Sequence, residues 1–140
     1  MKISPNLRKR LVGEIRFVIG KMKEAPDYRK KAYYFSAIPA EMLRLFNIEF
    51  DERLLFAYMN LNNVYQIITG TADAIAMGKE TAVVIFPEGF FEKLCEYLGV
   101  FTAEIEEDKD TCDMIEAITC LAYSATGNGF YLHQKGILKI

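Results

Sequence analysis

The sequence predicts an α+β protein that is predominantly helical, in which N-terminal helices surround one long central helix and a small C-terminal sheet packs with two further helices. Three observations lead to this fold class. Apolar residues recur at helical spacing through the middle of the chain, short β-branched or alternating runs follow it, and turn residues separate these segments. Short apolar runs fit a helix as well as a strand, so an all-α bundle is the alternative.

The first fifty residues predict three helices. Ser4-Pro5 is typical of an N-cap followed by proline at the first helical position. An apolar stripe then continues to about Lys23; it consists of Leu7, Leu11, Ile15, Val18 and Met22. Pro26-Asp27 breaks this helix, and a second helix is expected from Asp27 to Ala37. Pro39 interrupts the chain again, so that a short third helix is expected over 40–46.

The central helix is expected over about 51–77. Its main apolar stripe alternates between spacings of three and four residues: Leu54, Tyr58, Leu61, Tyr65, Ile68, Ala72 and Ile75. Asp51 is a suitable N-cap, and Gly78 is a suitable terminator. A second apolar patch lies off this stripe, which indicates that protein covers the helix on two sides. We therefore expect it to be the centre of the core or part of a subunit interface.

The C-terminal part is expected to hold the sheet. The run 81–86 is β-branched and stops at Pro87, and 100–106 alternates apolar and polar residues as a half-buried strand does. A helix ending at Gly99 precedes the second run, and a helix from Asp110 or Thr111 to about Ala125 follows it. FYLHQ and ILKI, on either side of Lys135-Gly136, predict a small hairpin.

Length and composition predict one domain over 1–140, because 140 residues with 51% hydrophobic and 26% charged residues suffice for an ordinary core. The uncharged run 54–72 has nineteen residues, close to the length of a membrane span, but it contains four side-chain amides that hydrocarbon would leave without partners. We expect no membrane association. Early basic residues exclude a signal peptide, and three cysteines at irregular spacing fit the cytoplasm, which is the expected location.

Few residues have the spacing that catalysis or metal binding requires. His133 is the sole histidine, and Cys112 and Cys120 lie eight residues apart on one predicted helix, about 12 Å along its axis. That separation excludes a disulfide and a shared tetrahedral zinc ion. Acidic neighbours disfavour the thiolate form of Cys95 and Cys112. No phosphate-binding glycine motif is present, so we expect neither a metal nor another cofactor, and an enzyme is the less favoured class.

Charge is unevenly distributed along the chain. Residues 1–50 carry eleven basic and five acidic side chains, a net charge of +6, whereas residues 51–140 carry six and fourteen, a net charge of −8. Attraction between the two parts, within one chain or between subunits, is favoured over nucleic-acid binding. The basic residues that would form a nucleic-acid patch are Arg8, Lys9, Arg10, Arg29, Lys30 and Lys31, the last three interleaved with tyrosines.

Three functions are compatible with these patterns. The favoured hypothesis is a non-catalytic, homo-oligomeric interaction protein, with a dimer formed through the central helix. The second is a nucleic-acid-associated protein that uses the basic patch. The third is a small-molecule sensor or enzyme with a pocket near Asn62, Tyr65 and Gln66; Tyr65 belongs to the main stripe, and the two amides lie away from it.

Overall fold

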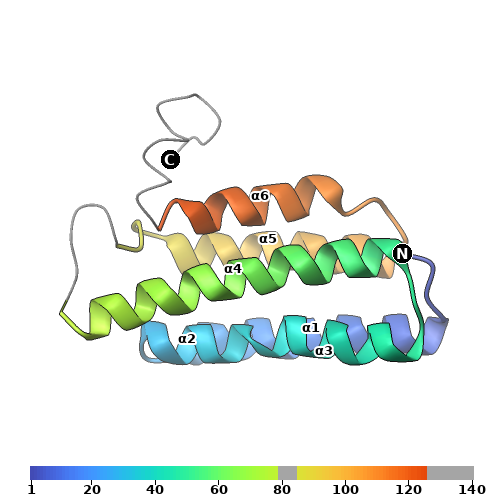
Figure 1. The fold of residues 1–140 in the computed structure, drawn as a ribbon, viewed down its shortest axis with the longest axis horizontal. Coiled ribbons are helices and arrows are strands. Elements are labelled where there is room, and N and C mark those ends of the chain that lie inside the picture. The colour runs from blue at the N-terminus through green and yellow to red at the C-terminus, as the bar shows by residue number, and fades with distance from the viewer. Residues whose placement is uncertain (79–84, 126–140) are drawn as a thin grey trace.

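The computed structural model describes residues 1–78 and 85–125, and it places six α-helices in them (Figure 1). Their bounds are α1 Pro5–Glu24, α2 Tyr28–Phe35, α3 Ala37–Ile48, α4 Glu52–Ala76, α5 Phe90–Glu106 and α6 Cys112–Tyr123. All regular secondary structure in these two ranges is helical. The predicted C-terminal sheet is therefore wrong, and the all-α alternative fits the structure.

The helices pack side by side in a closed ring. α2 and α3 follow one another end to end and occupy one position, so that the order around the ring is α1, α2–α3, α4, α6 and α5. The ring closes where α5 packs against α1. In Figure 1, α4 crosses the front of the molecule between α6 above it and α2–α3 below it. This position gives α4 neighbours on both flanks and leaves its outer side without a covering helix.

The core runs along the inside of the ring. Each helix contributes residues at spacings of three and four, for example Leu54, Leu61 and Ile68 of α4, which are fully buried. Phe35 and Phe101 are the largest of the fully buried side chains among the described residues. Burial of one such side chain contributes about 1.5–3 kcal/mol, so the apolar stripes account for most of the stabilisation of this ring.

Side-chain caps define where three helices begin. Ser4, Asp27 and Asp51 accept hydrogen bonds from the backbone N–H groups of Leu7, Lys30 and Leu54, at 3.4, 2.8 and 2.9 Å. These contacts confirm the predicted caps of α1 and α4. Gly78, which follows α4, has a φ of +74°, a left-handed conformation that favours glycine.

The predicted strand over 100–106 is part of α5. The sequence places Gly99 where a helix would end, but Gly99 is exposed inside the helix, and a Cβ there would meet no atom within 4 Å. The buried residues Leu98, Phe101, Thr102 and Ile105 follow the helical spacing of the preceding turns. Thr102 donates its hydroxyl to the carbonyl of Leu98 at 2.6 Å. The packing of α5 therefore keeps residues 100–106 helical, although their short alternating pattern also fits a strand.

Two other predictions differ from the structure or fall outside it. α3 begins at Ala37 rather than at residue 40, because Pro39 lies in its first turn, where the missing N–H is tolerated. Ile85 and Phe86 belong to neither a helix nor a strand. The rest of the predicted strand over 81–86, the predicted hairpin and His133 lie outside the described residues.

Candidate functional site

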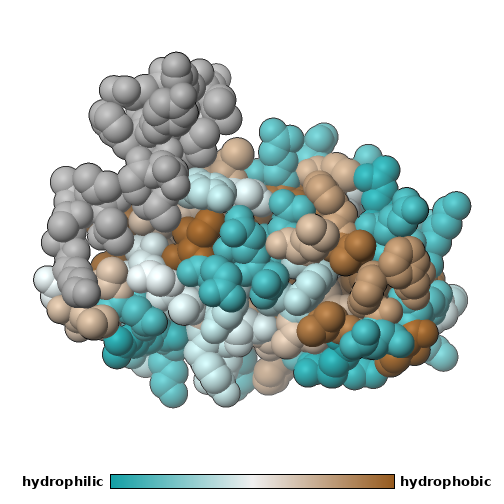
Figure 2. Space-filling model, in the orientation of Figure 1, coloured by the Kyte–Doolittle hydropathy of each residue, from teal (hydrophilic) through white to brown (hydrophobic). Residues whose placement is uncertain are grey.

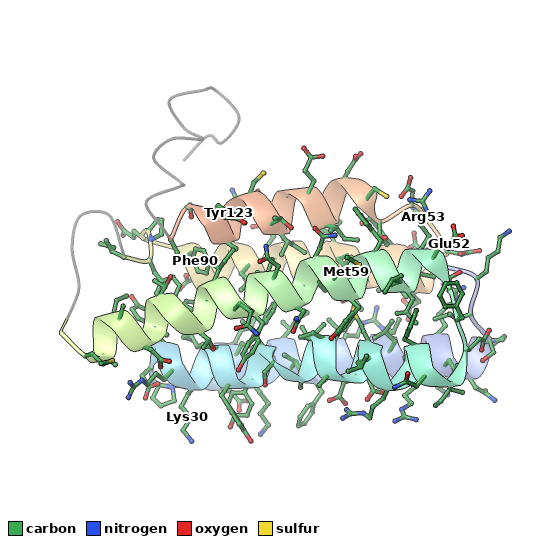
Figure 3. All side chains as sticks on the ribbon, in the orientation of Figure 1. Lys30, Glu52, Arg53, Met59, Phe90 and Tyr123 are labelled. Atoms are coloured by element: carbon green, nitrogen blue, oxygen red, sulfur yellow. The ribbon has the colours of Figure 1, made fainter. Side chains whose placement is uncertain are left out.

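The outer side of α4 is exposed and carries no ionised group between Arg53 and Asp73. Phe56, Met59, Asn63 and Gln66 lie along it at spacings of three, four and three, and we call these four residues the α4 face. The side chains of Phe56 and Met59 are 44% and 59% exposed. Figure 3 shows Met59 in the N-terminal half of α4, far from Lys30 on α2. The uncharged stretch noted in the sequence therefore includes exposed side chains as well as buried ones.

Further apolar side chains are exposed on one flank of α4, on α3 and the α3–α4 connection. Leu43 of α3 is 42% exposed, and Ile48 and Phe50, beside the α3–α4 connection, are each 65% exposed. Figure 2 shows tan and brown side chains gathered over the N-terminal half of α4 and the adjoining part of α3. Contiguous exposed apolar surface of this kind marks interaction sites more often than isolated apolar residues do.

The amides and tyrosine predicted to line a pocket all lie on α4 but differ in burial. Asn62 and Tyr65 are half-buried, whereas Gln66 is exposed on the α4 face. Asn62 lies three turns before Asp73 on the same side of the helix, the flank that meets α2–α3. The neighbouring amide Asn63 faces the opposite flank, since its Nδ2 donates to the hydroxyl of Tyr123 on α6 at 3.5 Å. These side chains therefore diverge along the helix.

The first group of predicted nucleic-acid contacts lies at the start of α1. Arg8 is half-buried and donates to the carbonyls of Met1 and Ile105, at 2.6 and 2.7 Å. Arg10 forms an ion pair at 2.6 Å with Glu41, whose side chain is buried. Lys9 is exposed. Arg8 and Arg10 thus already have partners within the fold, which leaves them less free to bind phosphate.

The second group lies at the start of α2. Arg29 pairs with Asp73 of α4 at 3.0 Å, and Lys31 donates to the carbonyl of Met22 at 2.7 Å. Lys30 is exposed. Lys9 lies near the start of α1 and the second group lies beyond its last residue, Glu24, so the two groups are separated by about 20 Å along this helix. The structure does not bring the six basic residues into one patch.

A hollow of about 670 Å³ lies between the start of α2 and the end of α4. Its lining residues are Asp27, Tyr28, Arg29, Lys30, Tyr33, Ala72, Ile75 and Ala76. The segment YRKKAYYF, which the sequence singles out, contributes two tyrosines and two cations to it. Asp27 and Asp73 balance the two cations, so the surroundings of the hollow are close to neutral. The three small or aliphatic residues from α4 were not predicted, because only the packing of α2 on α4 brings them here.

The cysteines lie in surroundings that disfavour the thiolate. Burial raises the pKa of the Cys95 thiol, and it also raises the pKa of Cys120. A hydrogen bond to the Asp110 carboxylate raises the pKa of Cys112, although Arg53 donates to its sulfur at 2.8 Å.

Among residues 1–78 and 85–125, no three His, Cys, Asp or Glu side chains are grouped so that they could hold a metal ion.

No protein-family model, curated protein or solved structure matches this chain. Within the described ranges, none of the helices is both long enough and apolar enough to cross a bilayer. The geometry of the surface is consequently the basis for a functional proposal, and the α4 face is its most distinctive feature.

Proposed function

We propose that this chain is a non-catalytic interaction protein that self-associates through the α4 face. One observation carries the proposal: the outer side of α4 is exposed yet free of ionised groups over five helical turns. Surfaces that stay in water usually carry lysine and glutamate, and 26% of this chain is charged. Interface centres instead lack charge and are enriched in aromatic residues and methionine.

The exposed side chains suit an interface between copies. Phe56 and Met59 supply apolar area, and Asn63 and Gln66 supply donors and acceptors without the desolvation cost of a buried charge. Because Ile48 and Phe50 extend the apolar area next to the N-terminal half of α4, we expect this half to form the centre of the contact.

The test is the mass of the protein in solution, measured by light scattering at high micromolar concentration. We expect a mass near twice 16.0 kDa for the native chain. Met59→Lys should give the mass of one chain, since a lysine ammonium would have to be desolvated at the centre of the contact. Val100→Lys is the matched control, because Val100 is an apolar residue of α5, 46% exposed, on a helix that does not pack against α4.

Two results would refute this proposal. The first is a native chain with the mass of one subunit. The second is a Met59→Lys variant whose dimer is as stable as that of Val100→Lys. Circular dichroism at 222 nm should show that both variants keep their helices, so that a lost dimer is not confused with lost folding.

A second candidate is the binding of single-stranded nucleic acid in the hollow between α2 and α4. The observation that favours it is the meeting of Tyr28 and Tyr33 with the exposed Lys30 in that hollow, since aromatic faces stack on bases and a cation attracts phosphate. A fluorescently labelled oligonucleotide should bind in low salt and lose affinity in Lys30→Glu. Lys93→Glu is the control, because Lys93 also lies over a tyrosine ring, Tyr97, but on α5.

A further inference from the structure

Five exposed apolar residues lie around the turn between α3 and α4. These two helices pack side by side and are joined by residues 49–51, so they run antiparallel. Leu43 is seven residues before Phe50, and Met59 is nine residues after it, which places both about 10–14 Å from the turn along their helices. We call the five residues the hairpin patch; they are Leu43, Ile48, Phe50, Phe56 and Met59. Figure 2 shows apolar side chains gathered in this part of the surface.

The hairpin patch lies at one end of α4 rather than at its middle. After Met59 the α4 face continues with two amides, Asn63 and Gln66. Near the end of the helix, an ion pair at 3.0 Å joins Asp73 to Arg29 of α2. Asp73 is fourteen residues after Met59, about 21 Å along the helix. A contact that buries the apolar surface must therefore be centred near Met59, well away from this ion pair.

α6 lies beside α4 and runs in the same direction. Near the start of both helices, a guanidinium nitrogen of Arg53 donates to the sulfur of Cys112 at 2.8 Å. Near the end of α4, the hydroxyl of Thr71 donates to the carbonyl of Ala125, just after α6, at 3.3 Å. The start of α6 is therefore next to the hairpin patch, and its end is next to the C-terminal half of α4.

The two flanks of the hairpin patch differ in chemistry. On the α3 flank, Ile48 and Phe50 are exposed and apolar. On the α6 flank, the first turns of α6 carry Asp113 and Glu116, both exposed. What meets these two carboxylates therefore decides how a second copy can lie.

α3 offers these carboxylates no cation on the side that faces α4. Arg44 is the only basic residue of α3. It pairs at 2.6 Å with Glu41, which also pairs at 2.6 Å with Arg10 of α1. Arg44 is therefore held toward α1, away from the hairpin patch.

A second copy can join the hairpin patch about a two-fold axis in two main ways. An axis along α4 keeps the two α4 helices parallel and places the α3 flank of each copy opposite the α6 flank of the other. Ile48 and Phe50 would then cover the carboxylates of Asp113 and Glu116 and remove water from them. Desolvation of a carboxylate without a partner charge is costly, so this arrangement is disfavoured.

An axis across the hairpin patch makes the two α4 helices antiparallel and places equal flanks opposite each other. The copies can then lean onto their α3 flanks, so that Ile48 and Phe50 of both copies are buried among apolar side chains. The same tilt moves the two α6 flanks apart and leaves Asp113 and Glu116 in water. Apolar surface is buried without desolvation of a carboxylate, so this arrangement is favoured.

The antiparallel contact has the size of a reversible dimer interface. Rotation about an axis at Met59 brings Phe50 opposite residue 68, so the overlap is about 27 Å long. Two helices side by side are about 20 Å wide. The overlap therefore covers about 500 Å² of each copy, about 1,000 Å² in total, which is typical of weak specific interfaces. A mass measurement at high micromolar concentration suits a contact of this size.

We infer that a second copy packs with its α4 antiparallel to the first, about a two-fold axis that crosses the hairpin patch near Met59. This inference rests on the proposed self-association and specifies its geometry. Because the axis is near one end of α4, the other ends of the two α4 helices project in opposite directions. The hollow between α2 and α4 therefore stays open in both copies.

Opposite charges at residue 48 distinguish the two arrangements. In the antiparallel arrangement, Ile48→Lys and Ile48→Glu should each raise the dissociation constant by about tenfold or more, because the same charge of both copies enters an apolar contact. In the parallel arrangement, Ile48→Lys would face Asp113 and Glu116 and bind more tightly than the native chain, whereas Ile48→Glu would bind more weakly. Val100→Lys and Val100→Glu are the matched controls and should leave the constant unchanged. Sedimentation equilibrium measures the constant, and circular dichroism checks that each variant is folded.

Distances between two spin labels locate the axis. The background replaces the half-exposed Cys112 and Cys120 with serine and keeps the buried Cys95. Lys30→Cys and Asp113→Cys are then labelled separately; both positions are exposed and lie outside the hairpin patch. Pulsed electron paramagnetic resonance measures the distance between the labels of the two copies.

The expected distances follow from the contacts that α2 and α6 make with α4. Lys30 lies at the level of Asp73, about 21 Å beyond Met59, so the two Lys30 labels should be about 40 Å apart. Asp113 lies at the level of Arg53, about 9 Å before Met59, so the two Asp113 labels should be about 20 Å apart.

Other results overturn the inference. Parallel helices keep each pair of labels at the same end, so the two distances would be about equal. An antiparallel contact centred on the middle of α4 would make the Asp113 distance the longer one. A dimer with either pattern contradicts the inference and leaves the proposed function standing. A native chain with the mass of one subunit contradicts the proposed function itself, so the two failures are distinguishable.

Discussion

Replacement of Asp51 by alanine tests how the start of α4 is held. The Asp51 carboxylate accepts two backbone hydrogen bonds at 2.9 Å. One comes from Leu54 in the first turn of α4, and the other comes from Lys2 in the N-terminal segment before α1. Asp51→Ala removes both contacts. It therefore removes the N-cap of the longest helix and the tie between that helix and the N-terminal segment.

The expected loss of stability follows from these two contacts. Loss of an N-cap costs about 1 kcal/mol, and loss of the hydrogen bond to Lys2 costs about 1 kcal/mol more. The free energy of unfolding should fall by about 2 kcal/mol. For a chain of this size each kcal/mol lowers Tm by about 3–4 °C, so the expected decrease is about 7 °C.

The effect should depend on pH. Burial raises the pKa of the Asp51 carboxyl, but the N–H donors of Lys2 and Leu54 outweigh burial, and the pKa is lowered overall. A carboxyl with a lowered pKa stabilises the folded state above its unfolded pKa, and this contribution disappears as the pH falls through the folded pKa. The difference between native chain and Asp51→Ala should thus be complete at pH 7 and shrink below about pH 4.

Urea unfolding followed by circular dichroism at 222 nm measures this difference at each pH. Asp51→Asn is the control, because asparagine is a good N-cap without a charge, so it should retain part of the stability and lose the pH dependence. A decrease below 0.5 kcal/mol at pH 7 in Asp51→Ala, about the smallest effect ascribed to an N-cap, would refute this account of the start of α4. A difference that stays constant down to pH 2.5 would refute the role of the charge.

Three further predictions concern the stability of helices and core and the reactivity of the thiols. Gly13→Ala should raise the unfolding free energy by about 0.5–1 kcal/mol, because a Cβ at this exposed position in α1 meets nothing within 4 Å; a decrease in urea unfolding would contradict this. Phe101→Ala should cost about 3–5 kcal/mol in the same assay, since Phe101 is fully buried, and a cost below 1 kcal/mol would show that its site collapses. Ellman's reagent should modify Cys112 before the buried Cys95, and Asp110→Asn should accelerate labelling of Cys112 by removing the carboxylate that raises its pKa; an unchanged rate would exclude that cause.

The long helix is the element that the sequence predicts best. The expected range 51–77 agrees with α4 at Glu52–Ala76 to within one residue at each end. The agreement has a local cause: Asp51 caps the first turn, the apolar stripe covers every turn, and Gly78 follows the end. α1 is predicted equally well for the same reasons, since Ser4 and Pro5 define its start.

The error over 100–106 shows where local patterns fail. Phe101, Ala103 and Ile105 alternate over too few residues to exclude a helix, and Gly99 suggests an end that packing does not require. The inner side of α5 is defined by Leu94 and Leu98, two turns and one turn before Phe101, and only the ring of helices shows that 101–105 continues it.

The sequence predicts that the long helix carries an uncharged surface, but it does not predict which residues form that surface. The sequence identifies an uncharged helix, and burial then decides that Met59 and Gln66 face outward whereas Tyr65 is half-buried. The two basic clusters are about twenty residues apart in the sequence, and they lie on different helices: Lys9 lies near the start of α1, and Lys30 follows the end of α1, at the start of α2. This separation follows from the length of α1; what the sequence does not give is the packing of α2 on α4, which pairs Arg29 with Asp73.

Closure of the ring through α1 and α5 also affects how the chain folds during synthesis. Arg16 of α1 forms its ion pair with Glu106, ninety residues later in the sequence. α1 to α4 leave the ribosome before α5 does, and the side of α1 that α5 covers is then open to water. Since translation adds about 5–20 residues per second, this exposure lasts for seconds, the interval in which a chaperone that recognises apolar helices has access to the nascent chain.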